Sequence, residues 1–423
     1  QEEENDRLLD GGELGVQRKL YYRELVARFG HHLALNWNLG EENDLYDELG
    51  DTNNTRVRAY ASYIKSLDPY NHHIVIHSYP NSQSELYEPL LGDSDLTGPS
   101  LQIQINNIHR DVKRWINDSK ASGKQWVVTN DEQGDHTTGV AADASYSGDK
   151  GSRGDNRSDV RHKTLWGTLM AGGAGVEYYF GYQTGVTDLT AEDWRSRKTK
   201  WEDAKLALDF FNDYLPFWAM ESRDELISKS GSYCFAKTGE IYVVYIPSSG
   251  TESLNLSGVS GTYSVRWYNP RSGGSLKQGS VATINGGGVR NLGTAPADTG
   301  ADWVALVEKT SDSGGEGGGT GNCEADFEEQ NGRVIIEAEN LDLAQGWNTG
   351  NSFADATGSG YIVWKGGNSF SSPGNGTIST SIVIHTPGTY RFEWRNKVGH
   401  GTNSTEANDS WVRFPDADDF YGE

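Results

Sequence analysis

Two apolar stretches that each run into a pair of carboxylates constrain this chain more than any other feature. The first reads HHLALNWNLGEEN and reaches Glu41 and Glu42. The second reads QWVVTNDEQG and reaches Asp131 and Glu132. A (β/α)8 barrel places its functional side chains at the carboxyl ends of parallel strands. The pattern therefore predicts two strands of such a barrel, with both carboxylate pairs on one rim.

The segments around these stretches alternate between helical and strand patterns. Besides the two carboxylate stretches, the spacing of apolar residues predicts helices at 16–29, 51–67, 108–119, 160–171 and 200–214, and strands at 73–77, 101–105 and 172–182. Strands that alternate with helices indicate a parallel sheet covered by helices. We interpret residues 1–218 as strands four to eight of a TIM barrel, with the carboxylates on strands four and seven. The first three strands would precede them in a longer protein.

The pattern changes after residue 218 to short strands separated by Gly, Ser and Asn-Pro turns. Strands are predicted at 232–235, 241–246, 253–256, 262–268 and 303–307, which is typical of an antiparallel β-sandwich at 219–309. A Gly/Ser linker at 310–322 follows. Strands predicted at 333–338, 361–364, 378–384 and 389–395 form part of a second sandwich at 323–423. The fold class is therefore α/β plus all-β.

Composition excludes several kinds of partner. The formal net charge of −23 disfavours nucleic acid, because such a surface repels phosphate. No apolar run is long enough to span a membrane. Cys234 and Cys323 fall in different predicted domains, so no disulfide between them is expected, and no Cys/His spacing indicates zinc. We expect a monomer whose partner is a polysaccharide.

The two carboxylate stretches resemble strand motifs of a known group of enzymes. HLALNWNLGEEN resembles the fourth-strand motif of the retaining clan A glycoside hydrolases, and WVVTNDEQG resembles their seventh-strand motif. The resemblance implies that Glu42 is the acid/base and Glu132 the nucleophile. Glu41 stands where these enzymes usually have Asn, so a register shifted by one residue would make Glu41 the acid. Otherwise Glu41 would raise the pKa of its neighbour by like-charge repulsion or bind a sugar hydroxyl.

Two further resemblances concern the later parts of the chain. WGTLMAGGAGVEYYFG and WYNPRSGG resemble segments of barrels followed by a sandwich that carries the name "putative collagen-binding domain of a collagenase". GRVIIEAENLD resembles the first strand of family 6-type carbohydrate-binding modules. This resemblance implies that Glu337 and Glu339 help to hold a structural calcium ion. Catalysis itself would need no cofactor.

Each candidate residue also has a simpler interpretation. Any one of the four carboxylates alone is more commonly a solvated loop charge. Two pairs at strand ends favour catalysis instead, and Glu132 is preferred over Asp131. Candidate substrate contacts follow other predicted strands or lie in the neighbouring loops, and each competes with plain packing or solvation: His77, Tyr79, Gln104, His136, Asn5 and Tyr179.

These observations predict a secreted, cell-surface or periplasmic glycoside hydrolase that cleaves a plant or algal polysaccharide by retaining double displacement, whether endo- or exo-acting. One alternative is a polysaccharide lyase that uses His77 and Tyr79. Another is a non-catalytic glycan-binding protein on a barrel scaffold. A collagen-binding adhesin has the least support, because it rests on a name alone.

Overall fold

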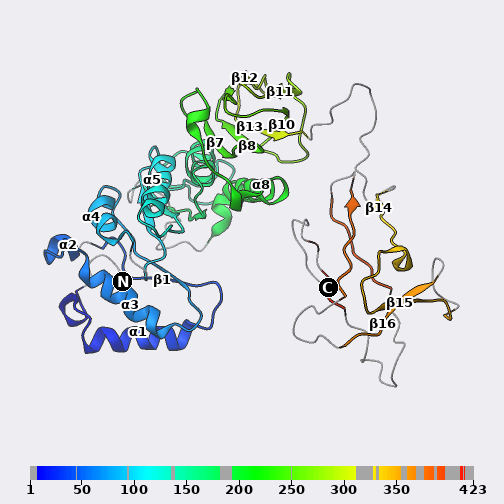
Figure 1. Ribbon diagram of the computed structural model, residues 1–423. Coiled ribbons are helices and arrows are strands. Elements are labelled where there is room, and N and C mark those ends of the chain that lie inside the picture. Colours follow the sequence, from blue (N-terminus) through cyan, green and yellow to red (C-terminus); the bar gives the residue numbers. More distant parts are fainter. Residues whose placement is uncertain are drawn as a thin grey trace. The chain divides into compact units, whose positions relative to one another are not determined.

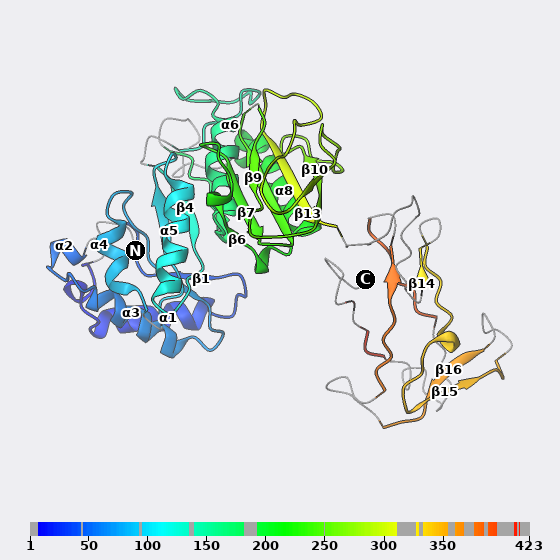
Figure 2. The same cartoon turned by 45° about the horizontal axis from the view of Figure 1, so that its top comes forward.

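The structure is a computed structural model, and it forms two compact units, Gln1–Ser313 and Gly314–Glu423. It describes residues 7–43, 45–92, 95–134, 139–181, 193–248, 250–310, 327–329, 333–353, 360–367, 376–384, 388–395, 410–412 and 414. Figures 1 and 2 show the helices and strands of each unit.

The first part of unit 1 contains five short parallel strands that pair in chain order. They are β1 (Asn36–Asn38), β2 (His73–Val75), β3 (Ser100–Ile103), β4 (Thr129–Gln133) and β5 (Gly175–Val176). Ladders join β1 to β2, β3 to β4 and β4 to β5, and a parallel bridge between His77 and Ser100 joins β2 to β3. Neighbours in sequence are therefore neighbours in space, as βαβ connections require.

Helices connect and cover these strands (Figure 1). The α-helices are α1 (Val16–Phe29), α2 (Leu45–Glu48), α3 (Thr55–Leu67), α4 (Gln83–Tyr87), α5 (Ile108–Ala121), α6 (Arg157–Asp159), α7 (Gly167–Met170) and α8 (Lys198–Tyr214). The predicted helix at 16–29 is confirmed with both ends. The helix predicted from residue 51 begins at Thr55, because the Asp51 carboxylate accepts the backbone N–H groups of Thr55 and Arg56 and so caps it.

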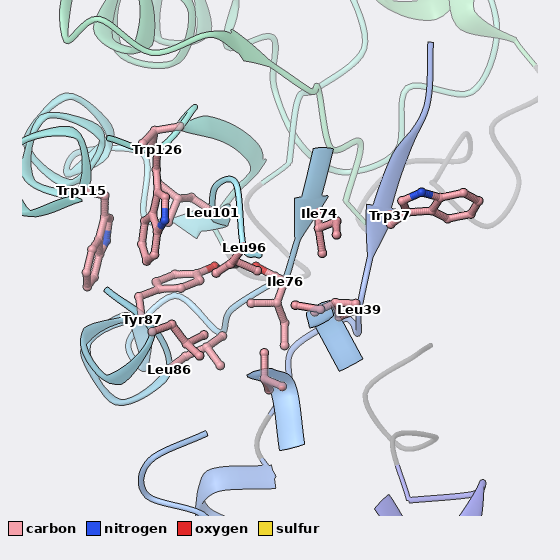
Figure 3. Close-up of a cluster of buried hydrophobic side chains, with 14 of the residues drawn as sticks. Trp37, Leu39, Ile74, Ile76, Leu86, Tyr87, Leu96, Leu101, Trp115 and Trp126 are labelled. Carbon is pink, nitrogen blue, oxygen red and sulfur yellow. Dashed lines mark hydrogen bonds between the residues drawn. The ribbon is translucent and has the colours of Figure 1, made fainter. Parts of the chain in front are cut away.

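An aromatic cluster fixes the seam between β2 and β3 (Figure 3). The buried Tyr87 hydroxyl lies 2.9 Å from the Ile76 carbonyl oxygen and 2.8 Å from that of Ser100. Trp115 and Trp126 pack against the Tyr87 ring. Burial raises the pKa of Tyr87 well above its ordinary value, so this hydroxyl stays a neutral hydrogen-bonding group.

Several predicted elements differ from those observed. Leu33 is 87% exposed, so the apolar run before β1 is not part of the strand. In the second stretch Trp126–Val128 precede the strand, and Asp131 and Glu132 lie within β4 rather than after it. Of the glycine-rich strand predicted at 172–182, only the two residues of β5 form a strand. The helix predicted at 160–171 is divided by a π-helix, η4 (Val160–Trp166).

The second part of unit 1 is a six-stranded antiparallel sheet, ordered β11-β10-β13-β8-β7-β6, with a separate β12-β9 pair. These strands are β6 (Glu221–Ser222), β7 (Tyr233–Lys237), β8 (Ile241–Ile246), β9 (Ser253–Asn255), β10 (Thr262–Tyr268), β11 (Thr283–Asn285), β12 (Val289–Asn291) and β13 (Trp303–Lys309). The predictions of β8 and β10 are confirmed with their bounds, whereas β6, β11 and β12 were not predicted. Cys234 is buried in β7, and burial raises the pKa of its thiol. Cys323 lies outside the described residues.

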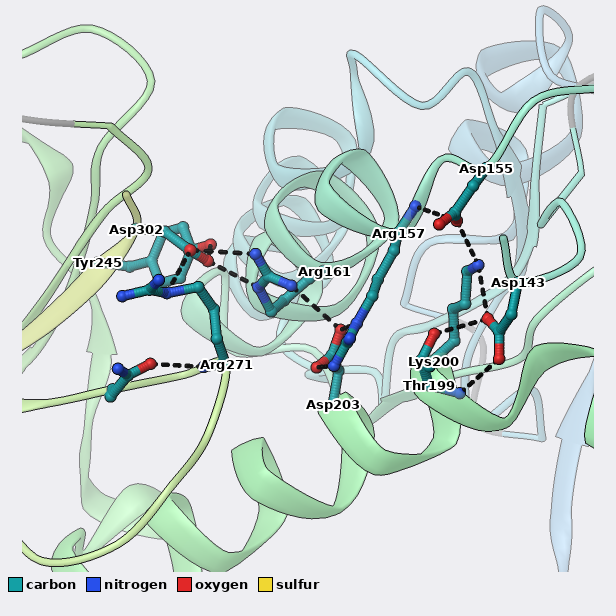
Figure 4. A network of polar contacts seen from close by, with 11 residues as sticks. Asp143, Asp155, Arg157, Arg161, Thr199, Lys200, Asp203, Tyr245, Arg271 and Asp302 are labelled. Carbon is teal, nitrogen blue, oxygen red and sulfur yellow. Dashed lines mark hydrogen bonds and ion pairs between the residues drawn. The ribbon is translucent and has the colours of Figure 1, made fainter. Parts of the chain in front are cut away.

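Buried apolar and charged contacts join the sheet to the helices. Trp166, Phe210 and Phe211 share one core cluster with Tyr245 and Leu306 of the sheet. The Arg161 guanidinium, which the π-helix presents, bonds Asp302 next to β13 and Asp203 of α8 (Figure 4). The antiparallel sheet and the parallel-strand region are therefore parts of the same unit.

Unit 2 contains β14 (Phe327–Glu328), β15 (Trp347–Gly350), β16 (Tyr361–Trp364) and β17 (Ile382–Val383). β15 and β16 pair antiparallel, whereas β14 and β17 pair parallel, contrary to the expected antiparallel pattern. The prediction of β16 is confirmed. The strand predicted at 333–338 is wrong, because residues 334–337 are irregular and a 3-10 helix, η8 (Ala338–Asn340), follows.

Candidate active site

Glu132 is the most enclosed of the four candidate carboxylates. It lies near the carboxyl end of β4 and is 9% exposed. Its Oε1 accepts a hydrogen bond from Gln102 Nε2 at 2.7 Å. Its Oε2 lies 3.4 Å from His77 Nε2. The Gln102 hydrogen bond therefore holds one carboxylate oxygen, and the His77 ring lies beside the other without a hydrogen bond to it.

His77 connects the two ends of the candidate site. Its backbone N–H donates to the Gly40 carbonyl at 3.0 Å, and its own carbonyl accepts the Asn43 N–H at 3.3 Å. Its Nδ1 lies 2.9 Å from Ser100 Oγ, which orients the ring so that Nε2 faces Glu132. When the Ser100 hydroxyl donates to Nδ1, the ring proton sits on Nε2 and faces the carboxylate. His77 thus contacts β3, β4 and the segment after β1 at once.

The first carboxylate pair follows β1 in a bend. Glu42 is half-buried and has a φ of +43°, a left-handed conformation that is uncommon for residues other than glycine. Glu41 is exposed. Backbone strain of this kind is concentrated at functional sites. Because Asn43, the next residue, is bonded to His77, the bend that holds Glu42 is tied to the residue that contacts Glu132.

Two buried amide side chains lie close in the chain to these residues, Asn43 directly after Glu42 and Asn130 on β4. Asn43 and Asn130 are 1% and 0% exposed, and neither side-chain amide has a hydrogen-bond partner among the described residues. The same holds for Gln102 Oε1. Each such group costs about 1–3 kcal/mol if it stays unsatisfied. Water or a polar ligand usually completes such groups.

Sequence reasoning missed Gln102, Asn130 and Asn43. The available signal was strand alternation, because residues two apart on a strand face the same side. Simple alternation would put Asn130 on the face of Glu132, but the register against β3 shifts between these two residues, so Asn130 pairs with Leu101 and Glu132 with Gln102. The pattern LQIQI marked two glutamines, and Gln104 was chosen, but Gln102 reaches Glu132. Gln104 follows β3 in a turn where its carbonyl accepts the Asn107 N–H at 2.7 Å.

The other predicted contacts are less central. Tyr79 is half-buried in the turn after β2, where its carbonyl accepts the Ser82 N–H at 3.3 Å. Tyr179 is half-buried, and its carbonyl accepts hydrogen bonds from Gln133 Nε2 at 2.7 Å and from the Val140 N–H at 2.6 Å. Tyr179 thus anchors the residue after Glu132 through its main chain. Asn5 and His136 lie outside the described residues.

The predicted calcium ligands belong to unit 2. Glu339 Oε1 accepts the backbone N–H of Gly360 at 2.9 Å, and Glu337 immediately precedes η8. Within the described ranges, no group of three His, Cys, Asp or Glu side chains is placed to hold a metal ion. The two glutamates alone do not make the oxygen cage of six to eight ligands that calcium takes.

Known proteins resemble this chain at the level of fold. Residues 224–308 match the family model described as "Putative collagen-binding domain of a collagenase". A solved structure named "Glycoside hydrolase" superposes with a TM-score of 0.53 at 17% identity, covering 70% of this chain and 69% of that one. A glycoside hydrolase family 5 structure from Bacteroides vulgatus ATCC 8482 superposes with a TM-score of 0.51 at 17% identity, covering 69% and 66%. The chain therefore shares a mixed helix and sheet fold with glycoside hydrolases and spans about two thirds of their length.

No curated protein matches the chain. Among the helices of the described ranges, none is both long and apolar enough to cross a membrane.

Proposed function

We propose that this chain carries the site of a retaining glycoside hydrolase, with Glu132 as nucleophile and Glu42 as acid/base. The observation that supports this proposal most is the enclosed Glu132 carboxylate, which accepts a hydrogen bond from Gln102 and lies 3.4 Å from His77 Nε2. The fold shared with glycoside hydrolases agrees with it. The proposal includes the placement of β1 to β5 as strands four to eight of a TIM barrel.

The proposed reaction has two steps. Glu132 attacks the anomeric carbon and forms a glycosyl-enzyme, while Glu42 protonates the departing glycosidic oxygen. Glu42 then removes a proton from water, and the water oxygen displaces Glu132 with net retention. This requires the two carboxyl groups to lie about 5–5.5 Å apart with substrate bound. Gln102 and His77 would keep one Glu132 oxygen aimed at the sugar.

The side chains near Glu132 indicate the class of substrate. Uncommitted buried amides suit a ligand rich in hydroxyl groups, which can both donate and accept hydrogen bonds. We propose a plant or algal polysaccharide, cleaved outside the cell or in the periplasm, by a monomeric enzyme. Unit 2 would bind the same polymer and raise its local concentration, with calcium held by Glu337, Glu339 and further oxygen ligands.

The deciding experiment is a screen of the full protein on plant and algal polysaccharides, with new reducing ends and ultraviolet absorbance followed together. We expect reducing ends without absorbance, and a loss of about 10⁴-fold in kcat for Glu132→Gln because the nucleophile is removed. Glu42→Gln should lose turnover on substrates whose leaving group needs protonation. If Glu41→Gln is inactive and Glu42→Gln is active, the acid/base is Glu41 instead.

The same screen tests the alternatives. New absorbance from an unsaturated uronate would mean a polysaccharide lyase. In that alternative His77, which lies next to Ser100 and Glu132, or Tyr79 would act as the base. Polysaccharide binding without any cleavage would mean a non-catalytic glycan-binding protein.

A further inference from the structure

A groove of about 550 Å³ lies in unit 1 away from the residues described above. One wall comes from the segment after β4, with Asp143 and Tyr146. The other comes from the segment that leads into α8, with Asp193 and Arg195, and from the start of α8, with Glu202. A volume of a few hundred Å³ is the usual size of a site for a small molecule or a sugar unit.

Hydrogen bonds hold the two walls together. The Asp143 N–H donates to the Ser196 carbonyl at 2.7 Å. The Asp143 carboxylate accepts the Thr199 N–H at 2.8 Å, the Thr199 hydroxyl at 2.6 Å and Lys200 Nζ at 2.8 Å (Figure 4). Asp143 is 3% exposed, so the floor of the groove is a fixed part of the fold. A preformed groove of this kind can bind without an ordering cost.

The side chains that face the groove are polar, and their charges are paired. Asp193 accepts hydrogen bonds from the Tyr146 hydroxyl at 3.0 Å and from Arg195 Nε at 2.7 Å. Lys198 lies 3.5 Å from Glu202. Paired charges leave little net field to attract a free ion, and among the lining residues that the structure describes Tyr146 alone carries a large ring. Planar carboxylate and guanidinium groups with spare hydrogen-bonding capacity suit the vicinal hydroxyls of a sugar.

We propose that this groove is a distal saccharide site that holds a part of the polysaccharide chain away from the cleaved bond. The inference rests on the proposed function. Its walls follow β4 and β5, whose carboxyl ends lie on the same side as Glu132. The groove shares no lining residue with the Glu132 site, so a chain must extend beyond the sugar unit at Glu132 to enter it. The ligand class is a neutral polysaccharide with free vicinal hydroxyls.

Substrate length separates this site from catalysis. In the full protein, we would compare Tyr146→Ala and Arg195→Ala with wild type on a disaccharide and on longer oligosaccharides of the polymer that the enzyme cleaves. We expect KM for the long substrates to rise about tenfold, the loss of roughly one charge-assisted hydrogen bond, with kcat unchanged. Both parameters for the disaccharide should stay at the wild-type value. Arg28→Ala, which removes an exposed arginine from α1, is the matched control and should change neither.

The outcomes are distinguishable from failure of the proposed function. Equal losses on short and long substrates would assign Tyr146 and Arg195 to folding alone and overturn the inference, as would no loss on either. If wild type cleaves nothing, binding of the same oligosaccharides is measured by calorimetry. Weaker binding in the two variants, with Arg28→Ala unchanged, would then support the groove while the hydrolase proposal fails. No difference in binding would overturn the inference.

Discussion

Two buried polar clusters in unit 1 differ in how their groups are satisfied. In the cluster of Figure 4, each of the deeply buried charges meets an opposite charge. Arg161 bonds Asp302 at 2.7 Å and Asp203 at 3.2 Å, and Lys200 bonds Asp143 at 2.8 Å. By contrast, the amides of Asn43, directly after Glu42, and of Asn130, on the same strand as Glu132, have no partner among the described residues. Similar burial therefore serves two purposes.

The difference between the two clusters has a physical explanation. A buried charge is tolerated when a partner and further hydrogen bonds replace its water, so a complete network reports on the fold. A network that lacks some hydrogen bonds lowers the free energy of unfolding of the free protein. A ligand that supplies the missing hydrogen bonds restores it. The comparison thus predicts that substitutions in the first cluster lower stability, whereas substitutions near Glu132 spare stability and affect binding.

The largest expected effect on stability comes from Arg161→Ala. The substitution leaves the Asp302 carboxylate with Tyr245 at 2.7 Å and Arg271 at 3.4 Å, and it removes one of the two arginines that bond Asp203. Because both carboxylates are buried, we expect the free energy of unfolding to fall by about 3 kcal/mol, measured by denaturant titration. Arg28→Ala, whose exposed side chain pairs with Glu24, should cost under about 0.5 kcal/mol. Equal effects of the two variants would remove the distinction between the clusters.

A matched pair of buried amides gives a smaller but sharper contrast. Gln83 Oε1 accepts the Trp115 indole N–H at 2.7 Å, and its Nε2 donates to the Gln102 carbonyl at 3.1 Å. Gln83→Leu leaves the Trp115 indole N–H and the Gln102 carbonyl without this partner, so the free energy of unfolding should fall by about 2 kcal/mol. Asn130→Val removes an amide that has no partner within the described part, so stability should change by less than about 1 kcal/mol.

Binding of the polysaccharide should rank the same two variants in the opposite order from stability. Asn130→Val should weaken binding of the polymer, measured by calorimetry, because the amide available to the ligand is gone. Gln83→Leu should bind it nearly as wild type once folded. A loss of about 2 kcal/mol in the stability of Asn130→Val would show that Asn130 is a structural residue instead.

The sequence predicted the position of Glu132 better than its surroundings. An apolar run followed by carboxylates is a local pattern, and it located β4 to within a few residues. Gln102 was missed because the pattern LQIQI does not show that β3 ends at Ile103 and leaves Gln104 in the following turn. The π-helix was missed because the spacing of apolar residues over 160–171 predicts a helix without distinguishing its hydrogen-bond pattern. Short strands such as β11 and β12 lack enough residues to show a period.

The smallest expected effect concerns Asp155, at the more exposed end of the paired cluster. Burial acts to raise the pKa of Asp155, but the contact with Lys200 at 2.6 Å outweighs it and the pKa is lowered. A lowered pKa contributes stability that is complete above the unfolded-state value of about 3.9 and is lost as pH falls toward the lower folded-state value. Asp155→Asn should therefore cost about 1 kcal/mol at neutral pH, and its difference from wild type should shrink below about pH 4. Lys205→Ala, which breaks an exposed pair with Asp209 on α8, is the control and should show little cost at either pH. A difference that stays constant from pH 7 to well below 4 would mean that Asp155 acts through its shape and hydrogen bonds rather than through its charge.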